Sequence, residues 1–144
     1  MNKFINMISG ERFLFYALPV FLYMFLIFVL SSISHYPDIF PWVFSLDKFV
    51  HTIEYYVLGY LLMRMFVTSP RDIFSRVPIV FVIIFGVLYG ISDEWHQSFV
   101  PGRYASIYDI LFDIFGILLA VATYRFVRRR VVLVKIIEDM IEGV

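Results

Sequence analysis

Ionisable and polar side chains gather in three short stretches of this sequence, each beside a long apolar run. The stretches hold Asp47, Lys48, His51, Glu54 and Tyr55; then Asp93, Glu94, His96 and Gln97; then Arg103, Ser106, Asp109 and Asp113. In each stretch some of these residues recur four positions apart, which on a helix places them on one face. If the three faces meet, they form a polar cleft whose side chains are candidates for catalysis and binding.

A histidine beside carboxylates suits acid–base chemistry. His51 lies four residues after Asp47 and three residues before Glu54, and a nearby carboxylate orients an imidazole and stabilises its charged form. His51 with Asp47 or Glu54 can therefore act as an acid–base group. The candidate catalytic residues are His51, Asp47, Glu54, Tyr55, Asp93 and Glu94.

Ligand or cation binding is the alternative use of the same residues. Arg103 with Lys48 can hold a phosphate or carboxylate group, because a guanidinium binds such anions through two parallel hydrogen bonds. A divalent cation is also possible, since hard cations take oxygen ligands, although no known ligand spacing is matched. The acids that would join His51 around a cation are Asp93, Glu94, Asp109 and Asp113. The candidate substrate-binding residues are Lys48, Gln97, Arg103, Ser106, Asp109 and Asp113.

The composition indicates that lipid surrounds most of this chain. Of its 144 residues, 61% are hydrophobic and only 17% are charged, with a mean hydropathy of +0.83. Soluble domains have about 45–50% apolar and about 25% charged residues. The absence of Cys excludes disulfides and thiolate chemistry. A net charge of zero and a pI near 6.8 give no support for nucleic-acid binding.

Four apolar runs have the length that a membrane helix needs, about 20 residues. We expect spans at about 13–32, 47–67, 78–97 and 107–127, which makes an all-α, four-helix membrane bundle in a single domain over 1–144. Gly86 and Gly90 form a G-x-x-x-G pattern that lets another helix approach closely and offers a contact for an oligomer. Residues 131–144 have the spacing of an amphipathic helix lying on the membrane surface, with a frayed tail as the alternative.

The basic residues predict the orientation of the four spans. Both termini share one side, and all twelve Lys and Arg except Lys48 and Arg103 fall on that side. Cytoplasmic segments carry the excess of Lys and Arg, so both termini should be cytoplasmic. The three polar stretches then lie in the outer half of the membrane. A charge at the centre of a membrane helix costs about 2.5–3.5 kcal/mol and somewhat less near the interface, so six carboxylates there need a reason.

The polar stretches together resemble the VanZ-like family of small bacterial membrane proteins, named for an accessory protein that confers low-level teicoplanin resistance. The resemblance covers residues 47–116 and rests on Asp47-Lys48-x-x-His51-x-x-x-Tyr55, on Asp93-Glu94-x-x-Gln97-x-Phe99-x-Pro101-Gly102-Arg103-x-x-Ser106-x-x-Asp109, and on Gly116. It implies a location in the bacterial cytoplasmic membrane but no established reaction. Asp113 departs from the family pattern, which usually has Asn at that place, so any role that needs a neutral donor there is in doubt.

We therefore expect the cleft to bind or modify a lipid-linked cell-wall precursor or a lipoglycopeptide antibiotic at the outer surface. Asp93, Glu94 and Asp109 would position the head group or a cation, and Arg103 would pair with an anionic group. Tyr55 and Gln97 would donate hydrogen bonds. Two alternatives remain at this point. The same residues can bind a ligand without turnover, or they can form a lock that only fixes the packing of the helices.

Overall fold

The computed structural model describes residues 2–34, 43–130, 136 and 140, and these residues form helices joined by short connections. The helices are α1 (Asn2–Ser31), α2 (Val43–Val67), α3 (Asp72–Arg76), α4 (Pro78–Gln97) and α5 (Ile107–Arg130). Within the described ranges there is no strand, so the predicted all-α class is confirmed. The predicted amphipathic helix at 131–144 lies outside the described residues, apart from Ile136 and Met140.

The helix ends agree closely with the predicted spans where a strong local signal exists. α4 covers the predicted 78–97, with Pro78 in its first turn, where a missing N–H costs nothing. α1 begins at Asn2, well before the predicted start of the first span, and α5 continues through Arg130. The five-residue helix α3 lies between the second and third predicted spans, in a segment for which no helix was predicted.

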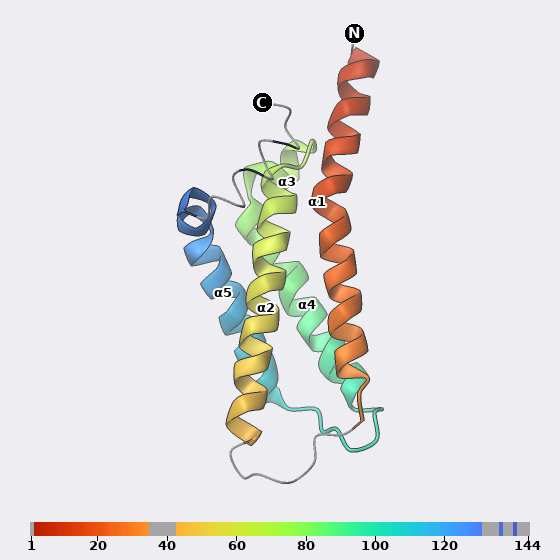
Figure 1. The fold of residues 1–144 in the computed structure, drawn as a ribbon, viewed down its shortest axis with the longest axis vertical. Helices are drawn as coiled ribbons and strands as arrows, with labels where there is room; N and C mark the ends of the chain where they lie inside the picture. The colour runs from red at the N-terminus through yellow and green to blue at the C-terminus, as the bar shows by residue number, and fades with distance from the viewer. Residues whose placement is uncertain (1, 35–42, 131–135, 137–139, 141–144) are drawn as a thin grey trace.

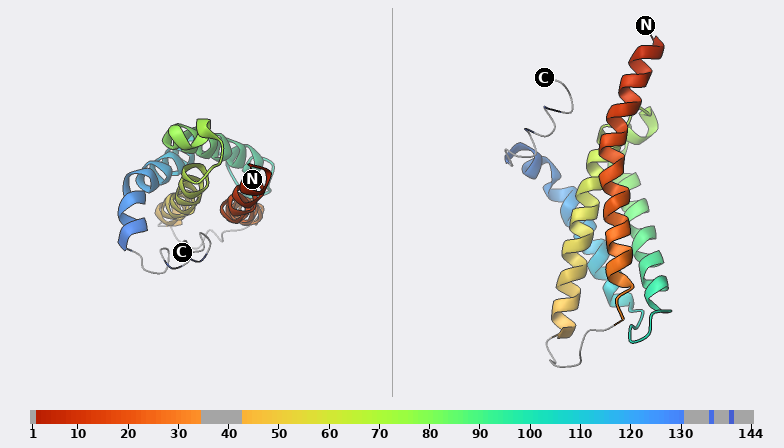
Figure 2. Two further views of the ribbon diagram at one scale, coloured as in Figure 1. Left: turned by 90° about the horizontal axis from the view of Figure 1, so that it is seen from above. Right: turned by 45° about the vertical axis from the view of Figure 1, so that its right-hand side comes forward.

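The long helices pack as an antiparallel bundle (Figure 1). α1 and α4 run in one direction while α2 and α5 run in the other, so α3 and the C-terminal end of α5 lie at the end where α1 begins. α2 contacts α1, α4 and α5, and its contact with α5 is the most extensive in the described chain. Seen along the bundle, α1, α4 and α5 surround α2 on three sides (Figure 2).

Glycines bring the helices close together around α5. A Cβ on Gly116 would overlap the backbone carbonyl oxygen of Thr52 and would lie 2.9 Å from the backbone nitrogen of Tyr56, both on α2. Gly86 and Gly90 are buried, and they face Ile117 and Asp113 of α5. The close helix approach predicted for G-x-x-x-G thus occurs inside the chain, and α5 occupies that surface.

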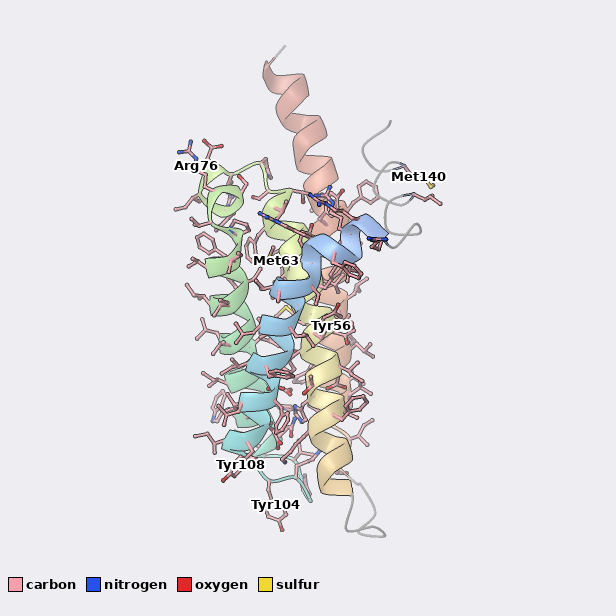
Figure 3. The ribbon with its side chains drawn as sticks, turned by 90° about the vertical axis from the view of Figure 1, so that its left-hand side faces the viewer. Tyr56, Met63, Arg76, Tyr104, Tyr108 and Met140 are labelled. Carbon is pink, nitrogen blue, oxygen red and sulfur yellow. The ribbon has the colours of Figure 1, made fainter. Side chains whose placement is uncertain are left out.

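The outer surface of the bundle is strongly apolar. Among the described residues, three helical segments are long and apolar enough to cross a membrane: Leu14–Ser31, Pro78–Gln97 and Ile107–Arg130. Large apolar side chains such as Phe21, Leu88 and Phe115 project outward from these helices and surround the bundle in Figure 3. An apolar belt of this extent is typical of membrane proteins rather than soluble monomers. α2 is not among the three segments, because its polar residues lower its hydropathy.

Candidate functional site

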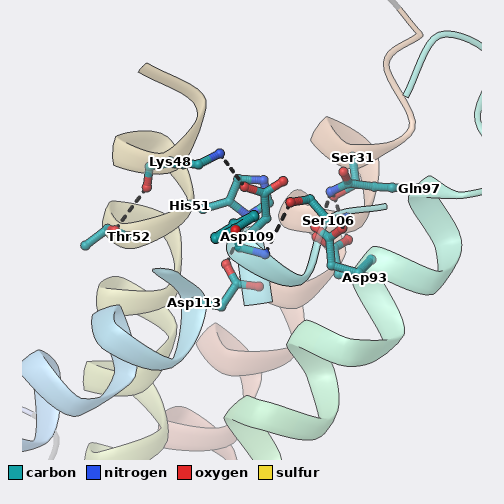
Figure 4. A network of polar contacts seen from close by, with 11 residues as sticks. Ser31, Lys48, His51, Thr52, Asp93, Gln97, Ser106, Asp109 and Asp113 are labelled. Carbon is teal, nitrogen blue, oxygen red and sulfur yellow. Dashed lines mark hydrogen bonds and ion pairs between the residues drawn. The ribbon is translucent and has the colours of Figure 1, made fainter. Parts of the chain in front are cut away.

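The polar stretches meet inside one end of the bundle. Figure 4 shows side chains of α1, α2, α4 and α5 converging there, and each of these helices contributes residues from one of its ends. Among the described side chains at this end, six polar ones are exposed by only 0–5%: His51, Asp93, Glu94, Gln97, Asp109 and Asp113. We call the polar residues gathered here, together with Ser31, Lys48, Glu54 and Tyr55, the polar cluster. The stripes predicted from the spacing of four therefore do face one another.

His51 pairs with a carboxylate from across the bundle. Its Nδ1 lies 2.9 Å from Oδ1 of Asp113 on α5, and both side chains are almost fully buried. Gly90 of α4 makes room for this carboxylate, because a Cβ on Gly90 would lie 3.0 Å from Asp113 Oδ2. The sequence suggested Asp47 or Glu54 as the partner of His51. The structure places Asp113 there, while the side chain of Asp47 lies outside the described residues.

An ion pair joins α2 to the start of α5. Lys48 Nζ donates to Asp109 Oδ1 at 3.2 Å. Asp109 lies in the first turn of α5, where the helix dipole favours a negative charge. Ser106 accepts a hydrogen bond from the N–H of Tyr108 through its Oγ at 3.2 Å, which is the geometry of an N-cap. Ser106 thus fixes where α5 starts and so where Asp109 points.

Glu94 is held by the backbone that leads into α5. The N–H of Ser106 donates to Glu94 Oε2 at 2.7 Å. Ser106 was predicted to bind substrate with its side chain. In the structure its Oγ caps the N-terminus of α5, and its backbone N–H donates a hydrogen bond to Glu94.

Asp93 and Gln97 form a third group with the end of α1. Ser31 Oγ donates to Asp93 Oδ1 at 2.6 Å, and Gln97 Nε2 donates to Asp93 Oδ2 at 3.1 Å. The neighbouring Ser32 lies 3.0 Å from Nε2 of His96. Ser31 was not among the predicted site residues. The sequence hints only that it needs a partner, because it is a polar residue at the end of an apolar span, and it does not show which residue that partner is.

Glu54 and Arg103 lie at the edge of the polar cluster. Glu54 is partly buried and close enough to His51, Asp93 and Asp113 for their charges to interact. Arg103 lies within the same electrostatic range of Glu54. The predicted cleft open to the outside differs from the structure in one respect, since most of these side chains are enclosed by the helices instead of lining an open wall.

Three oxygen atoms of the polar cluster are buried without a hydrogen-bond partner among the described residues. They are Glu94 Oε1, Asp113 Oδ2 and Tyr55 Oη. A buried polar group without a partner costs about 1–3 kcal/mol, and more when it is charged. His51, Glu94 and Asp109 also bring one possible metal-binding atom each to within 4.8 Å of one another. The arrangement can therefore accept a ligand or a cation without displacing any hydrogen bond of Glu94 Oε1 or Asp113 Oδ2.

Comparison with models of known protein families gives a match. The model of the VanZ/LLP1 family matches residues 4–128. The chain belongs to the VanZ-like family. The match includes α1 and most of α5, and so reaches beyond residues 47–116, where the VanZ-like motifs were recognised. Searches of curated proteins and of solved structures find no match.

Proposed function

We propose that this VanZ-like protein spans the bacterial cytoplasmic membrane four times and binds the head group of a lipid-linked envelope molecule. Such a molecule would be a lipid-linked cell-wall precursor, or a lipoglycopeptide of the teicoplanin type. The bound head group would lie against the polar cluster, with Lys48 and Arg103 facing its anionic part. Membership of a family named for teicoplanin resistance supports this direction, and the enclosed acids and imidazole supply groups that can also modify the head group.

The charge distribution supports the orientation proposed here. Arg64 and Arg76 lie in the last turns of α2 and α3, and Arg71 immediately precedes α3. Arg128–Arg130 lie in the last turn of α5, at the same end of the bundle, opposite the polar cluster. Cytoplasmic segments are enriched in such residues. With both termini in the cytoplasm, the polar cluster lies in the outer half of the membrane.

Exposed aromatic side chains mark the depth of the polar cluster. Trp95, Phe99 and Tyr104 are 69%, 70% and 89% exposed, and along the chain they lie within a few residues of members of the cluster. Figure 3 shows Tyr104 and Tyr108 at the end of the bundle opposite Arg76. Trp and Tyr favour the membrane–water interface, so this end lies at the depth of lipid head groups.

The observation that carries the proposal is the set of three unpartnered oxygens. A polar cluster that served only to lock helices together would be expected to satisfy its own buried groups, because a half-satisfied network is less stable than an apolar core. Glu94, Asp113 and Tyr55 each leave an oxygen without a partner in the described chain. Those atoms are suited to a ligand.

A lock remains the second candidate, and specific contacts favour it. Lys48 with Asp109 and His51 with Asp113 tie α2 to α5 at the cluster end. Measuring the stability of variants distinguishes the lock from the binding site. A lock predicts that changes in these residues lower stability in proportion to any loss of resistance, whereas a binding site predicts lost function in a protein that still folds.

Teicoplanin susceptibility provides the test. The wild-type chain and its Tyr55→Phe and Glu94→Gln variants are expressed in a sensitive bacterium, with membrane levels measured by immunoblot. Both variants keep the shape of the side chain, so we expect normal levels with loss of most of the resistance. Arg76→Ala is the matched control, since Arg76 is exposed and pairs only locally with Asp72 at 3.0 Å.

Direct binding completes the test. Wild-type protein in nanodiscs is titrated with teicoplanin and with a purified undecaprenyl-linked precursor, and Glu94→Gln serves as the weakened variant. Binding of either molecule that is lost in the variant supports the proposal. Full resistance in both variants at normal membrane levels, together with no binding by the wild type, would refute it.

A further inference from the structure

We infer that His51, Glu94 and Asp109 bind one divalent metal ion between α2, α4 and α5. The ligand atoms of these residues lie within 4.8 Å of one another. Around Zn²⁺, ligands at about 2.0–2.2 Å in tetrahedral geometry are about 3.4 Å apart. Small side-chain rotations would close that difference, because the three residues already point into one space. One imidazole with two carboxylates suits Zn²⁺ or Mn²⁺ better than Mg²⁺ or Ca²⁺, which favour all-oxygen sites.

The hydrogen bond of His51 is the one expected of a metal ligand. Its Nδ1 lies 2.9 Å from Asp113 Oδ1. Metal-binding histidines almost always donate the N–H of one ring nitrogen to a carboxylate or carbonyl, which orients the other nitrogen toward the metal. We therefore assign the metal bond to Nε2 and give Asp113 the part of a positioning residue. Gly90 keeps that position open for the Asp113 carboxylate.

Glu94 offers a buried oxygen that nothing else in the described chain uses. The side chain is 3% exposed. The N–H of Ser106 fixes Oε2 at 2.7 Å, while Oε1 has no hydrogen-bond partner. A carboxylate held by one oxygen, with the other oxygen buried and unpartnered, is prepared for a cation. This atom is the observation that separates the site from an ordinary acidic cluster.

The excess of buried carboxylates around the site also favours binding of a cation. Among the described side chains at this end, four carboxylates are at most 5% exposed: Asp93, Glu94, Asp109 and Asp113. Lys48 supplies a positive charge to Asp109, and Arg103 lies near Glu54 at the edge of the cluster. Enclosed carboxylates are costly unless cations or hydrogen bonds compensate them. A divalent ion bound by Glu94 and Asp109 would add two positive charges beside these carboxylates and so reduce their mutual repulsion.

At this site His51 is a metal ligand instead of an acid–base group. Where the proposed function also holds, the ion would offer its remaining coordination positions to a phosphate or carboxylate oxygen of the lipid head group. The metal site itself does not depend on that step. Metal binding and head-group binding are measured separately, so either proposal can fail alone.

Metal content and affinity test the site. The full-length protein is purified in detergent, treated with EDTA, and titrated with Zn²⁺ and with Mn²⁺ by calorimetry. Bound metal is counted by mass spectrometry after desalting. We expect one ion per chain in the wild type, and at least 100-fold weaker binding in His51→Gln, Glu94→Gln and Asp109→Asn. Asp113→Asn should weaken binding about 10- to 100-fold, the usual effect of changing a residue that orients a ligand.

Two further variants separate metal binding from folding. His96→Gln is the matched histidine control, since His96 lies at the same end of the bundle but contacts Ser32, and it should bind like the wild type. Lys48→Met removes the cation that competes at Asp109 and should tighten binding about tenfold. A gain of affinity is not produced by unfolding.

Three results would overturn the inference. The first is a monodisperse, helical wild-type protein that retains no stoichiometric ion and binds neither metal below millimolar concentration. The second is equal loss in His96→Gln and His51→Gln. The third is weaker binding in Lys48→Met that folds normally. Binding of the ion without any binding of lipid or antibiotic supports the metal site and counts against the proposed function.

Discussion

Replacing Gly116 with alanine should disrupt the contact between α2 and α5. A Cβ at this position would overlap the carbonyl oxygen of Thr52, and it would lie 2.9 Å from Tyr56 N and 3.2 Å from Thr52 C. All three atoms belong to the backbone of α2. A backbone cannot rotate out of the way as a side chain can, so the two helices would have to separate along their contact.

Two opposing effects set the size of the change. An added methyl group in a tightly packed site costs about 1–3 kcal/mol, and the rigid neighbours at Gly116 place it near the upper end. Alanine is the better helix former by about 0.8–1.0 kcal/mol. The net loss of unfolding free energy should therefore be about 1–2 kcal/mol, which lowers the folded-to-unfolded ratio about tenfold.

Gly86→Ala is the matched control for Gly116→Ala. The new Cβ would also meet α5, but its neighbours are Cδ1 and Cγ1 of the Ile117 side chain. A rotamer shift costs about 0.5–1.5 kcal/mol and is offset by the gain in helix propensity. Titration of each detergent-solubilised protein with SDS, followed by circular dichroism, should show Gly86→Ala within about 0.5 kcal/mol of the wild type. If Gly116→Ala is as stable as the wild type, or if Gly86→Ala is the weaker variant, the described approach of α2 to α5 is wrong.

Three other substitutions give distinct outcomes. Gly90→Ala should lower metal affinity more than stability, because its Cβ would lie 3.0 Å from Oδ2 of Asp113 and push on the carboxylate; unchanged zinc titration would contradict this. Tyr89→Phe should lower unfolding free energy in the SDS titration by about 1 kcal/mol, since Tyr89 Oη donates to the carbonyl oxygen of Met24 at 2.5 Å and links α4 to α1. Arg76→Ala should change neither stability nor resistance, because exposed ion pairs contribute about 0–1 kcal/mol; a clear loss of either would assign Arg76 a role that its exposure does not suggest.

Local patterns in the sequence predict much of the fold. Apolar runs give the long helices, and Pro78 marks the start of α4 where the structure has it. The spacing of Asp109 and Asp113 places both on the inner face of α5, and both are buried. These features follow from one helix at a time, because helical periodicity fixes which residues share a face.

Contacts between distant helices were beyond the reach of such patterns. From the sequence alone, His51 could be paired only with carboxylates close to it along the chain. Its observed partner, Asp113, lies 62 residues away. That pairing depends on how far α2 and α5 are shifted along each other, which the close contact at Gly116 sets. Ser31 is another case, because nothing around it in sequence shows that Asp93 needs its hydroxyl.

The central position of α2 has a consequence for how the protein enters the membrane. α2 is not among the helices apolar enough to cross on their own, and the ion pair of Lys48 with Asp109 forms only when α5 is present. During synthesis, α2 leaves the ribosome well before α5. A charged residue at the centre of a membrane helix opposes insertion by about 2.5–3.5 kcal/mol, and one nearer a helix end, such as Lys48, opposes it by less. If α2 spans the membrane as we propose, it should therefore remain beside the insertion machinery until α5 brings Asp109 to Lys48, so that the polar cluster assembles as α2 completes its insertion.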